Sequence, residues 1–126
     1  MLMSHIPIVA ILDDDPGVRT SLSSLIRSLG YAVRSYGSAL EFLDDTASHD
    51  PDCMVTDIQM PGMTGDQLQA HLIASGRIFP IIFMTAFPAA GVEGRVMAAG
   101  AECFLQKPTE AAVIADCLTS ALAGPG

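Results

Sequence analysis

The fold class is decided by one stretch of sequence, Met54-Val55-Thr56-Asp57-Ile58-Gln59-Met60-Pro61-Gly62-Met63-Thr64-Gly65. Its first half is apolar and predicts the end of a buried strand. Its second half brings a proline and two glycines close together, which strands rarely tolerate, so it predicts a loop. Asp57 stands at the junction of the two halves. Because open α/β sheets place their chemistry at the carboxyl ends of the strands, Asp57 is the first candidate for a functional residue.

The composition fits one domain with a substantial core. The chain has 126 residues, of which 50% are hydrophobic and only 16% are charged, and this length is usual for a single domain. No apolar run approaches the ~18 residues that a membrane span requires, and the N-terminal sequence lacks the positive segment of a signal peptide. We therefore expect a cytoplasmic domain over residues 1–123, followed by a tail or the start of a linker over residues 124–126.

Charge and cysteine spacing argue against two kinds of site. The formal net charge is −8, whereas nucleic-acid binding needs clustered lysine and arginine, so direct nucleic-acid binding by this domain is not expected. The three cysteines, Cys53, Cys103 and Cys117, lack CxxC or Cys/His ligand spacing. They are predicted to be reduced core residues. The single lysine of the chain, Lys107, lies just beyond an apolar segment that is typical of a strand.

Strand-like and helix-like segments alternate along the whole chain. Short apolar runs predict strands over residues 6–12, 31–36, 53–56, 80–84 and 102–105. Helical spacing and capping signals predict helices from Pro16 to a stop at Gly30, from a Ser38–Glu41 capping box to about Ser48, around residues 68–73 with a stop at Gly76, over residues 92–97 with a stop at Gly100, and over residues 113–122 behind a Thr109 cap.

Five strand–helix units with short connections predict an α/β fold with a parallel sheet and right-handed crossovers. We expect the flavodoxin-like (βα)5 doubly wound sandwich, with strand order 2-1-3-4-5. This order is inferred from the fold class, because periodicity alone does not give strand order. The carboxyl ends of all five strands would then share one edge of the sheet.

Polar side chains follow four of the predicted strands. Asp13 and Asp14 follow the first strand, Asp57 the third, Thr85 the fourth and Lys107 the fifth. Three carboxylates repel one another unless a cation lies among them, and carboxylates together with a substrate phosphate suit Mg²⁺. Phosphoryl transfer to a carboxylate uses such a set, in which a lysine and a metal neutralise charge and a hydroxyl donates a hydrogen bond. Asp57 is the predicted nucleophile, because it would lie between the acidic pair and the Thr85/Lys107 side.

Each of these residues taken alone has a simpler interpretation. The run Asp13-Asp14-Asp15 could cap the following helix, and Asp57 could form an ordinary Asx turn. Thr85 could be a strand-end hydroxyl bonded to the backbone, and Lys107-Pro108 could be a solvated turn. The functional interpretation is favoured because the features occur together, each at the end of a different predicted strand.

The sequence resembles the receiver domain of bacterial two-component response regulators. The resemblance spans nearly the whole chain, and the Asp57 loop combined with the Lys-Pro pair at this spacing is highly specific. It rests on five segments: Leu12-Asp13-Asp14-Asp15, Asp57-Ile58-Gln59-Met60-Pro61-Gly62-Met63-Thr64-Gly65, Met84-Thr85-Ala86, Gly100-Ala101 and Phe104-Leu105-Gln106-Lys107-Pro108.

The resemblance implies a role for each candidate residue. Asp57 would accept a phosphoryl group from a histidine kinase or a phosphotransfer protein, and Thr85 and Lys107 would hold phosphoryl oxygens. The cofactor would be Mg²⁺, with Mn²⁺ as an alternative. Its ligands would be the side chains of Asp13, Asp14 and Asp57 and the backbone carbonyl of Gln59.

The resemblance also implies a switch. Thr85 would move toward the phosphoryl group and Phe104 would turn into the space it leaves. The face formed by the fourth helix, fifth strand and fifth helix would report this state to an output domain, which we expect to be transcriptional, or to a partner protein. A phosphorylation-dependent homodimer through this face is a further expectation. Phe104 stands where tyrosine is commoner in the family, so no phenolic hydroxyl can signal there.

Two residues are expected to set the lifetime of the phosphorylated state. Gln59 and Phe87 occupy positions that in receivers influence the access of water to the acyl phosphate. Phe87 is bulky and apolar, so we expect it to slow autodephosphorylation. The segment Phe87-Pro88-Ala89-Ala90-Gly91-Val92-Glu93-Gly94 is poor helix material, because an interior glycine costs roughly 1 kcal/mol against alanine. The fourth helix is therefore expected to be short, frayed or mobile, and alanine at Gly91 or Gly94 to stiffen it.

Two other functions are alternatives to the phosphorylated receiver. A phosphatase or nucleotide enzyme is not favoured, because the chain has no GxxxxGK[ST] or GxGxxG motif and has Gln59 where dehalogenase-like phosphatases carry a second aspartate. The chain is expected to be no enzyme beyond catalysing its own phosphoryl transfer and dephosphorylation. The alternative that stays open is a receiver-like protein-binding module that works without phosphorylation.

Overall fold

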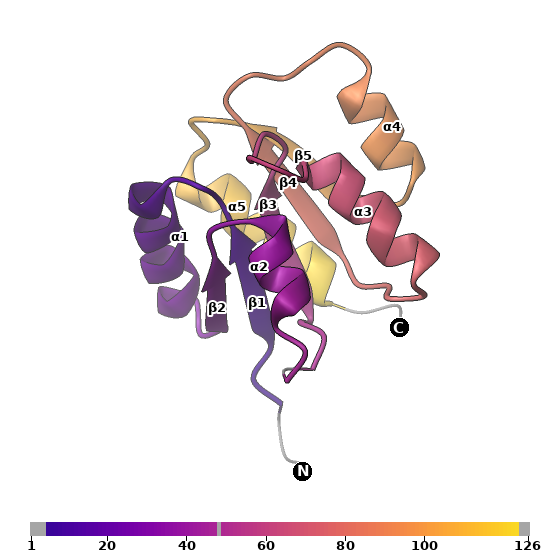
Figure 1. Cartoon of the computed structure of the whole chain (residues 1–126). Coiled ribbons are helices and arrows are strands. Elements are labelled where there is room, and N and C mark those ends of the chain that lie inside the picture. The colour runs from indigo at the N-terminus through magenta and orange to yellow at the C-terminus, as the bar shows by residue number, and fades with distance from the viewer. Residues whose placement is uncertain (1–4, 48, 124–126) are drawn as a thin grey trace.

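The computed structural model describes residues 5–47 and 49–123, in which strands and helices alternate (Figure 1). The strands are β1 (Ile8–Leu12), β2 (Ala32–Tyr36), β3 (Cys53–Asp57), β4 (Ile81–Thr85) and β5 (Cys103–Gln106). The helices are α1 (Pro16–Ser28), α2 (Ala39–Asp44), α3 (Gly65–Ala74), α4 (Val92–Ala98) and α5 (Ala111–Leu122). The tail predicted over residues 124–126 lies outside the described residues.

The sheet is parallel throughout, in the order β2-β1-β3-β4-β5. The predicted fold class, a flavodoxin-like (βα)5 sandwich, is confirmed. Leu12 lies opposite Thr56, and Asp57 lies opposite Met84. The carboxyl ends of β1, β3 and β4 are therefore level with one another at one edge of the sheet.

Strand alternation divides the core between the two faces of the sheet. On β3, Met54 packs with buried residues of α2, α3 and α4, whereas Val55 packs with buried residues of α1 and α5. On β4, Phe83 and Ile82 divide in the same way. Both faces of every central strand are covered, which explains why these strands read as continuous apolar runs.

The same alternation continues past the strand ends and places the polar residues there on one face of the sheet or the other. The N–H of Asp13 donates to the carbonyl of Tyr36 (3.2 Å) and the N–H of Lys107 to that of Thr85 (2.8 Å), so strand pairing continues through both residues. By the period of two, Asp13, Asp57 and Lys107 belong to the α1–α5 side of the sheet. Thr85 belongs to the opposite side, with Phe83.

The helix starts follow local capping chemistry. Asp15 caps α1, because its Oδ1 accepts hydrogen bonds from the N–H groups of Gly17 (2.8 Å) and Val18 (3.4 Å). Ser38 caps α2 as predicted, but the predicted capping box there is not closed. The Glu41 carboxylate accepts instead from the N–H of Gly37.

The structure corrects three other details of the prediction. Helix α2 ends at Asp44 and not near Ser48, because Asp45 leaves the helical conformation and its carboxylate accepts a hydrogen bond from the Tyr36 hydroxyl (2.5 Å). Thr109 does not cap α5, since its hydroxyl donates to the carbonyl of Gln106 (2.8 Å). Of the three free cysteines, Cys103 is only partly buried.

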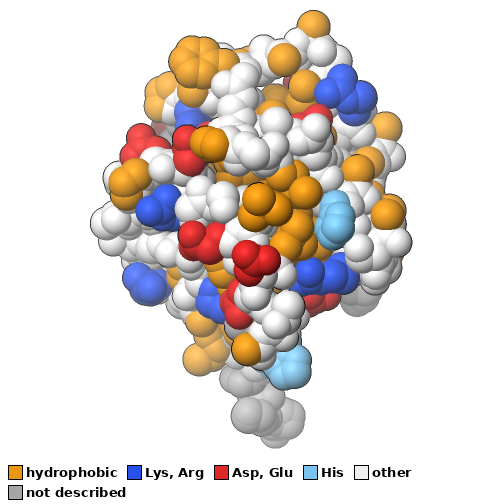
Figure 2. All heavy atoms as spheres, in the orientation of Figure 1, with side chains coloured by type: hydrophobic (Ala, Val, Ile, Leu, Met, Phe, Trp, Pro, Cys, Tyr) orange, Lys and Arg blue, Asp and Glu red, His pale blue; other side chains and the backbone are white. Residues whose placement is uncertain are grey.

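The surface carries no single-sign basic patch on the face shown in Figure 2, where lysine and arginine side chains are dispersed among acidic ones. Hydrophobic side chains gather near the middle of this face, over α2 and α3. The half-exposed apolar residues of these two helices are Leu40 and Ile73. Within residues 5–47 and 49–123, none of the helices has the length and apolar character needed to cross a membrane.

The loop after β3 folds back tightly onto the strand it leaves. The N–H of Gly65 donates to the carbonyl of Ile58 (2.7 Å), and a Cβ at Gly65 would lie 2.2 Å from the carbonyl oxygen of Asp57. Gly62, in the middle of the loop, has a φ of +84°. The two glycines of this stretch are therefore required for different reasons: Gly62 for its backbone conformation and Gly65 for a close approach of two backbone segments. A capping box that the sequence analysis missed, between Thr64 and Gln67, then starts α3.

Replacing Gly65 by alanine is predicted to lower the free energy of unfolding by about 1–3 kcal/mol or more, because the new methyl group would collide with backbone that cannot rotate away. Helix propensity alone would give the opposite sign. Urea denaturation of Gly65→Ala against the unsubstituted chain measures the effect. A stabilised variant would contradict the tight approach seen at this position.

Helix α4 is short, as predicted, and its two glycines differ in a way the sequence did not indicate. Gly91 lies at the N-cap with a φ of +82°, whereas a Cβ at Gly94 would have nothing within 4 Å. The expectation that alanine at Gly91 stiffens the helix is therefore wrong, because an L-residue is strained in the left-handed region.

Gly94→Ala is predicted to raise the free energy of unfolding by about 1 kcal/mol, since it adds helix propensity without a clash. Gly91→Ala is predicted to lower it by about 1–2 kcal/mol. Denaturant titration of the two single variants checks both signs, and equal effects from the two substitutions would refute the assignment.

Candidate functional site

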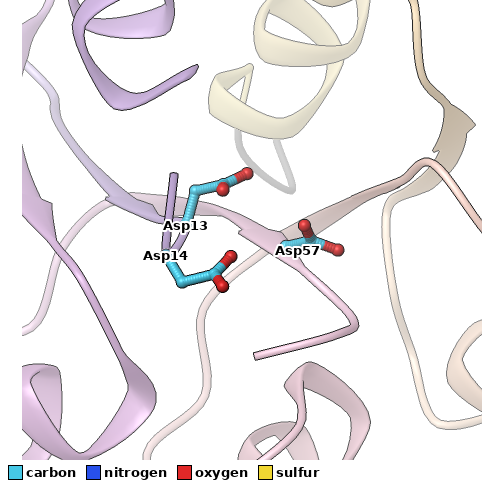
Figure 3. Close-up of side chains that lie close together, drawn as sticks. All are labelled: Asp13, Asp14 and Asp57. Atoms are coloured by element: carbon cyan, nitrogen blue, oxygen red, sulfur yellow. The ribbon is translucent and has the colours of Figure 1, made fainter. Parts of the chain in front are cut away.

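Three carboxylates meet at the carboxyl edge of the sheet. Asp13 and Asp14 follow β1 and Asp57 ends β3, and one carboxylate oxygen from each lies within 4.8 Å of the others. Figure 3 shows the side chains of Asp13 and Asp14 extending from the end of β1 toward Asp57. Asp13 is buried and Asp57 nearly so, whereas Asp14 is exposed. The cluster therefore combines two fixed carboxylates with one that solvent can reach.

The ammonium group of Lys107 joins the two buried carboxylates. Its Nζ lies 2.7 Å from Asp13 Oδ2 and 3.0 Å from Asp57 Oδ2, and its side chain is 18% exposed. Burial opposes the charged form of Lys107, but the hydrogen bonds from its ammonium group to the two carboxylates outweigh burial and raise its pKa above the ordinary value. The lysine is therefore protonated at neutral pH and holds a positive charge against Asp57.

The second oxygens of these carboxylates are bound by the local backbone. Asp57 Oδ1 accepts a hydrogen bond from the N–H of Gln59 (3.1 Å), and Asp13 Oδ1 accepts one from the N–H of Asp15 (2.9 Å). Asp57 thus forms the Asx turn of the simpler interpretation through one of its oxygens, and Asp13 forms a turn of the same kind and does not cap the helix. In the acidic run after β1, Asp15 caps the helix, while Asp13 and Asp14 turn to the cluster.

The charge distribution favours a cation beside Asp14. Two ionised carboxylates whose oxygens lie 4.8 Å apart, the upper limit in this cluster, repel each other by about 3.5 kcal/mol at an effective dielectric constant of roughly 20. Lys107 contacts Asp13 and Asp57. Among the described residues, Asp14 is the member of the cluster that has no cationic side chain within salt-bridge distance. Oxygen donors with solvent access on one side suit a hard divalent cation that keeps part of its water shell.

Thr85 and Phe104 lie next to this cluster but on the other side of the sheet. Thr85 is buried, and its hydroxyl accepts a hydrogen bond from the N–H of Phe87 (3.3 Å). Phe104 is partly buried and packs against the core beneath α2, α3 and α4. It pairs with Phe83, two residues before Thr85 on the neighbouring strand. The two predicted switch residues therefore share one face of the sheet.

Gln59 and Phe87 lie in the loops that follow β3 and β4. Gln59 is exposed, and its side-chain Nε2 donates to the carbonyl of Phe87 (3.4 Å). The Phe87 side chain is 72% exposed. The loops after β3 and β4 are thus linked through the side chain of Gln59.

One contact at the site was missed from the sequence. The guanidinium of Arg19, one turn into α1, donates from Nη1 to the backbone carbonyl of Asp13 (2.6 Å). An arginine in the first turns of an amphipathic helix is ordinarily read as part of its solvated face. The sequence carries no signal that it reaches back six residues to the acidic loop.

Comparison with known proteins identifies the family. The family model for the response regulator receiver domain matches residues 9–119. The transcriptional regulatory protein FixJ of Azorhizobium caulinodans is 42% identical over 108 residues, which are 85% of this chain and 51% of that protein. The transcriptional regulatory protein TdiR of Thauera aromatica is 38% identical over 115 residues, 91% of this chain and 51% of that protein.

Solved structures of response regulators have the same fold as this chain. The crystal structure of FixJ-N superposes with a TM-score of 0.85 at 31% identity, covering 98% of both chains. The response regulator StyR superposes with a TM-score of 0.87 at 38% identity, over 94% of this chain and 60% of that one. The chain spans about half the length of the curated relatives it matches. Fold, sequence motifs and relatives agree, and the chain belongs to the response regulator receiver domain family.

Proposed function

We propose that this domain is a phosphorylation-switched signalling receiver in which Asp57 accepts a phosphoryl group from a histidine kinase or a phosphotransfer protein. The observation that carries the proposal is the Lys107 ammonium, which lies 3.0 Å from Asp57 Oδ2 while two further carboxylates lie within reach of the same point. A nucleophilic carboxylate, a fixed ammonium and an acidic pair for a divalent cation are the parts that phosphoryl transfer to aspartate needs.

In the transfer, a carboxylate oxygen of Asp57 forms a bond to phosphorus while the bond from phosphorus to the donor imidazole nitrogen breaks. The electron pair of that bond leaves with the imidazole. Lys107, which already contacts Asp57, becomes the counter-ion of a phosphoryl oxygen. The donor set fits Mg²⁺, or Mn²⁺ in its place, which would supply positive charge to the phosphoryl oxygens. It would be held by Asp13, Asp14, Asp57 and the backbone carbonyl of Gln59.

The switch is part of this proposal. Thr85 would exchange its bond with the N–H of Phe87 for one with a phosphoryl oxygen, and Phe104 would move into the space left on the same side of the sheet. Helix α4 is attached to α3 by the Gln69 side chain, which donates to the carbonyl of Val96 (3.0 Å). A short helix on few polar contacts suits an element that repacks when the site changes. The face made of α4, β5 and α5 would report the state.

The receiver would pass its signal to an output domain or a partner protein. Relatives named as transcriptional regulators, about twice as long as this chain, support a transcriptional output. A homodimer that forms on phosphorylation through the α4, β5 and α5 face belongs to the proposal. A cytoplasmic location also belongs to the proposal, and the three free cysteines suit it. The domain would catalyse only its own phosphoryl transfer and dephosphorylation.

Incubation with acetyl phosphate and Mg²⁺ is predicted to add one phosphoryl group, seen by intact mass. Asp57→Asn should abolish the gain, because it removes the nucleophile. Asp116→Asn, which changes an exposed acid on α5, is the matched control and should leave the gain intact. No gain in the unsubstituted chain would favour the alternative of a binding module that works without phosphorylation.

Phe87→Glu is predicted to speed the loss of the phosphoryl group on the order of tenfold, about 1.4 kcal/mol of barrier, because it replaces an apolar ring at the rim by a group that attracts water. The decay is followed by intact mass after removal of acetyl phosphate, with Mg²⁺ present. Ile78→Glu, at an exposed apolar residue between α3 and β4, is the control. An unchanged decay rate in Phe87→Glu would refute shielding by this side chain.

A further inference from the structure

Arg19 is tied to the loop that carries the acidic pair. Its Nη1 donates to the carbonyl oxygen of Asp13 at 2.6 Å, in a part-buried contact. The other polar groups of Asp13 are also engaged: its N–H with Tyr36, and its two carboxylate oxygens with the N–H of Asp15 and with Lys107. With the arginine in place, every polar group of Asp13 has a partner, so this residue has one orientation.

The hydrogen bond from Arg19 to the carbonyl of Asp13 also affects the direction in which the side chain of Asp14 projects. The carbonyl of Asp13 belongs to the same planar peptide unit as the nitrogen and Cα of Asp14. A donor that fixes the carbonyl therefore fixes the plane from which the Asp14 side chain projects. Asp14 itself is exposed, so packing does little to hold its carboxylate near Asp57.

The position of the guanidinium is set by the connection between β2 and α2. A Cβ at Gly37 would lie 3.3 Å from Arg19 Nη1 and 3.6 Å from Glu41 Oε2. Glu41 is itself held there, since its Oε1 accepts from the N–H of Gly37 (3.1 Å). The absence of a side chain at Gly37 leaves room for the arginine between the acidic loop and this connection.

We propose that Arg19 is a positioning residue of the divalent-cation site, which orients the Asp13–Asp14 peptide so that the carboxylate of Asp14 faces Asp57. This inference rests on the proposed cation site of Asp13, Asp14 and Asp57. Groups that orient metal ligands in this way typically contribute about tenfold or more to metal affinity.

A role in positioning and a role through charge alone predict opposite effects. The guanidinium is positive and near the site, so its charge by itself repels a divalent cation. Removing that charge would tighten cation binding if electrostatics alone mattered. Removing an orienting donor weakens it. The sign of the change in affinity therefore separates the two roles.

The test is the affinity for Mn²⁺, measured from the electron paramagnetic resonance signal of the free ion, with Mg²⁺ as competitor. Arg19→Met, which keeps length and removes the donor and charge, is expected to weaken Mn²⁺ binding about tenfold. Arg19→Lys keeps a donor and the charge, and its Mn²⁺ affinity is expected to lie between those of Arg19→Met and the unsubstituted chain. Arg27→Met changes an exposed arginine in the last turn of the same helix and is expected to bind as the unsubstituted chain does. Thermal melting without metal reports the fold of each variant.

Unchanged or tighter Mn²⁺ binding by both Arg19 variants would overturn the inference while leaving the cation site standing. Asp14→Asn tests that site separately and is expected to lose most of the affinity. If the unsubstituted chain does not bind Mn²⁺, or if Asp14→Asn binds it equally well, the cation site of the proposed function is refuted. The proposed role of Arg19 is then refuted as well. A lower melting temperature in Arg19→Met with Mn²⁺ affinity retained would assign the arginine a structural role only and would also overturn the inference.

Discussion

The site depends on one ammonium group placed among three carboxylates. Lys107 bonds to Asp13 and Asp57, which are buried at the sheet edge and would otherwise repel each other. This requires β1, β3 and β5 to keep their register and the same alternation of side chains, because a shift of one residue would turn any of the three groups to the other face. The helices that pack on both faces of the sheet support this arrangement, because they bury the strands and hold them in register.

The three neighbouring aspartates of the acidic loop after β1 make different contacts. Asp15 satisfies free N–H groups at the start of α1, Asp13 is held by four bonds including that of Arg19, and Asp14 faces solvent beside Asp57. Three residues with the same side chain thus differ because their backbones differ. Helix capping and the proposed cation site do not compete here, because they use separate residues.

Sheet alternation also places the residues proposed for phosphoryl transfer and those proposed for the switch on opposite faces of the sheet. Asp13, Asp57 and Lys107 belong to the side of α1 and α5, whereas Thr85 and Phe104 belong to the side of α2, α3 and α4. A change of charge at Asp57 would therefore be felt across the sheet edge by groups that pack beneath α4. That helix is the shortest of those on its face apart from α2, and it contains an interior glycine.

The sequence by itself determined the alternation of strands and helices, the parallel sheet and the residues at its carboxyl edge, because periodicity, caps and strand-end polar residues are local signals. It also indicated the acidic loop and Lys107 through their resemblance to a known family. Only the tertiary structure decided that Gly65 must lack a side chain against Asp57, that Gly91 needs a left-handed backbone, and that Arg19 reaches Asp13. These features arise where segments distant in sequence, or separate turns of one loop, approach within van der Waals or hydrogen-bond distance, and no local pattern encodes that approach.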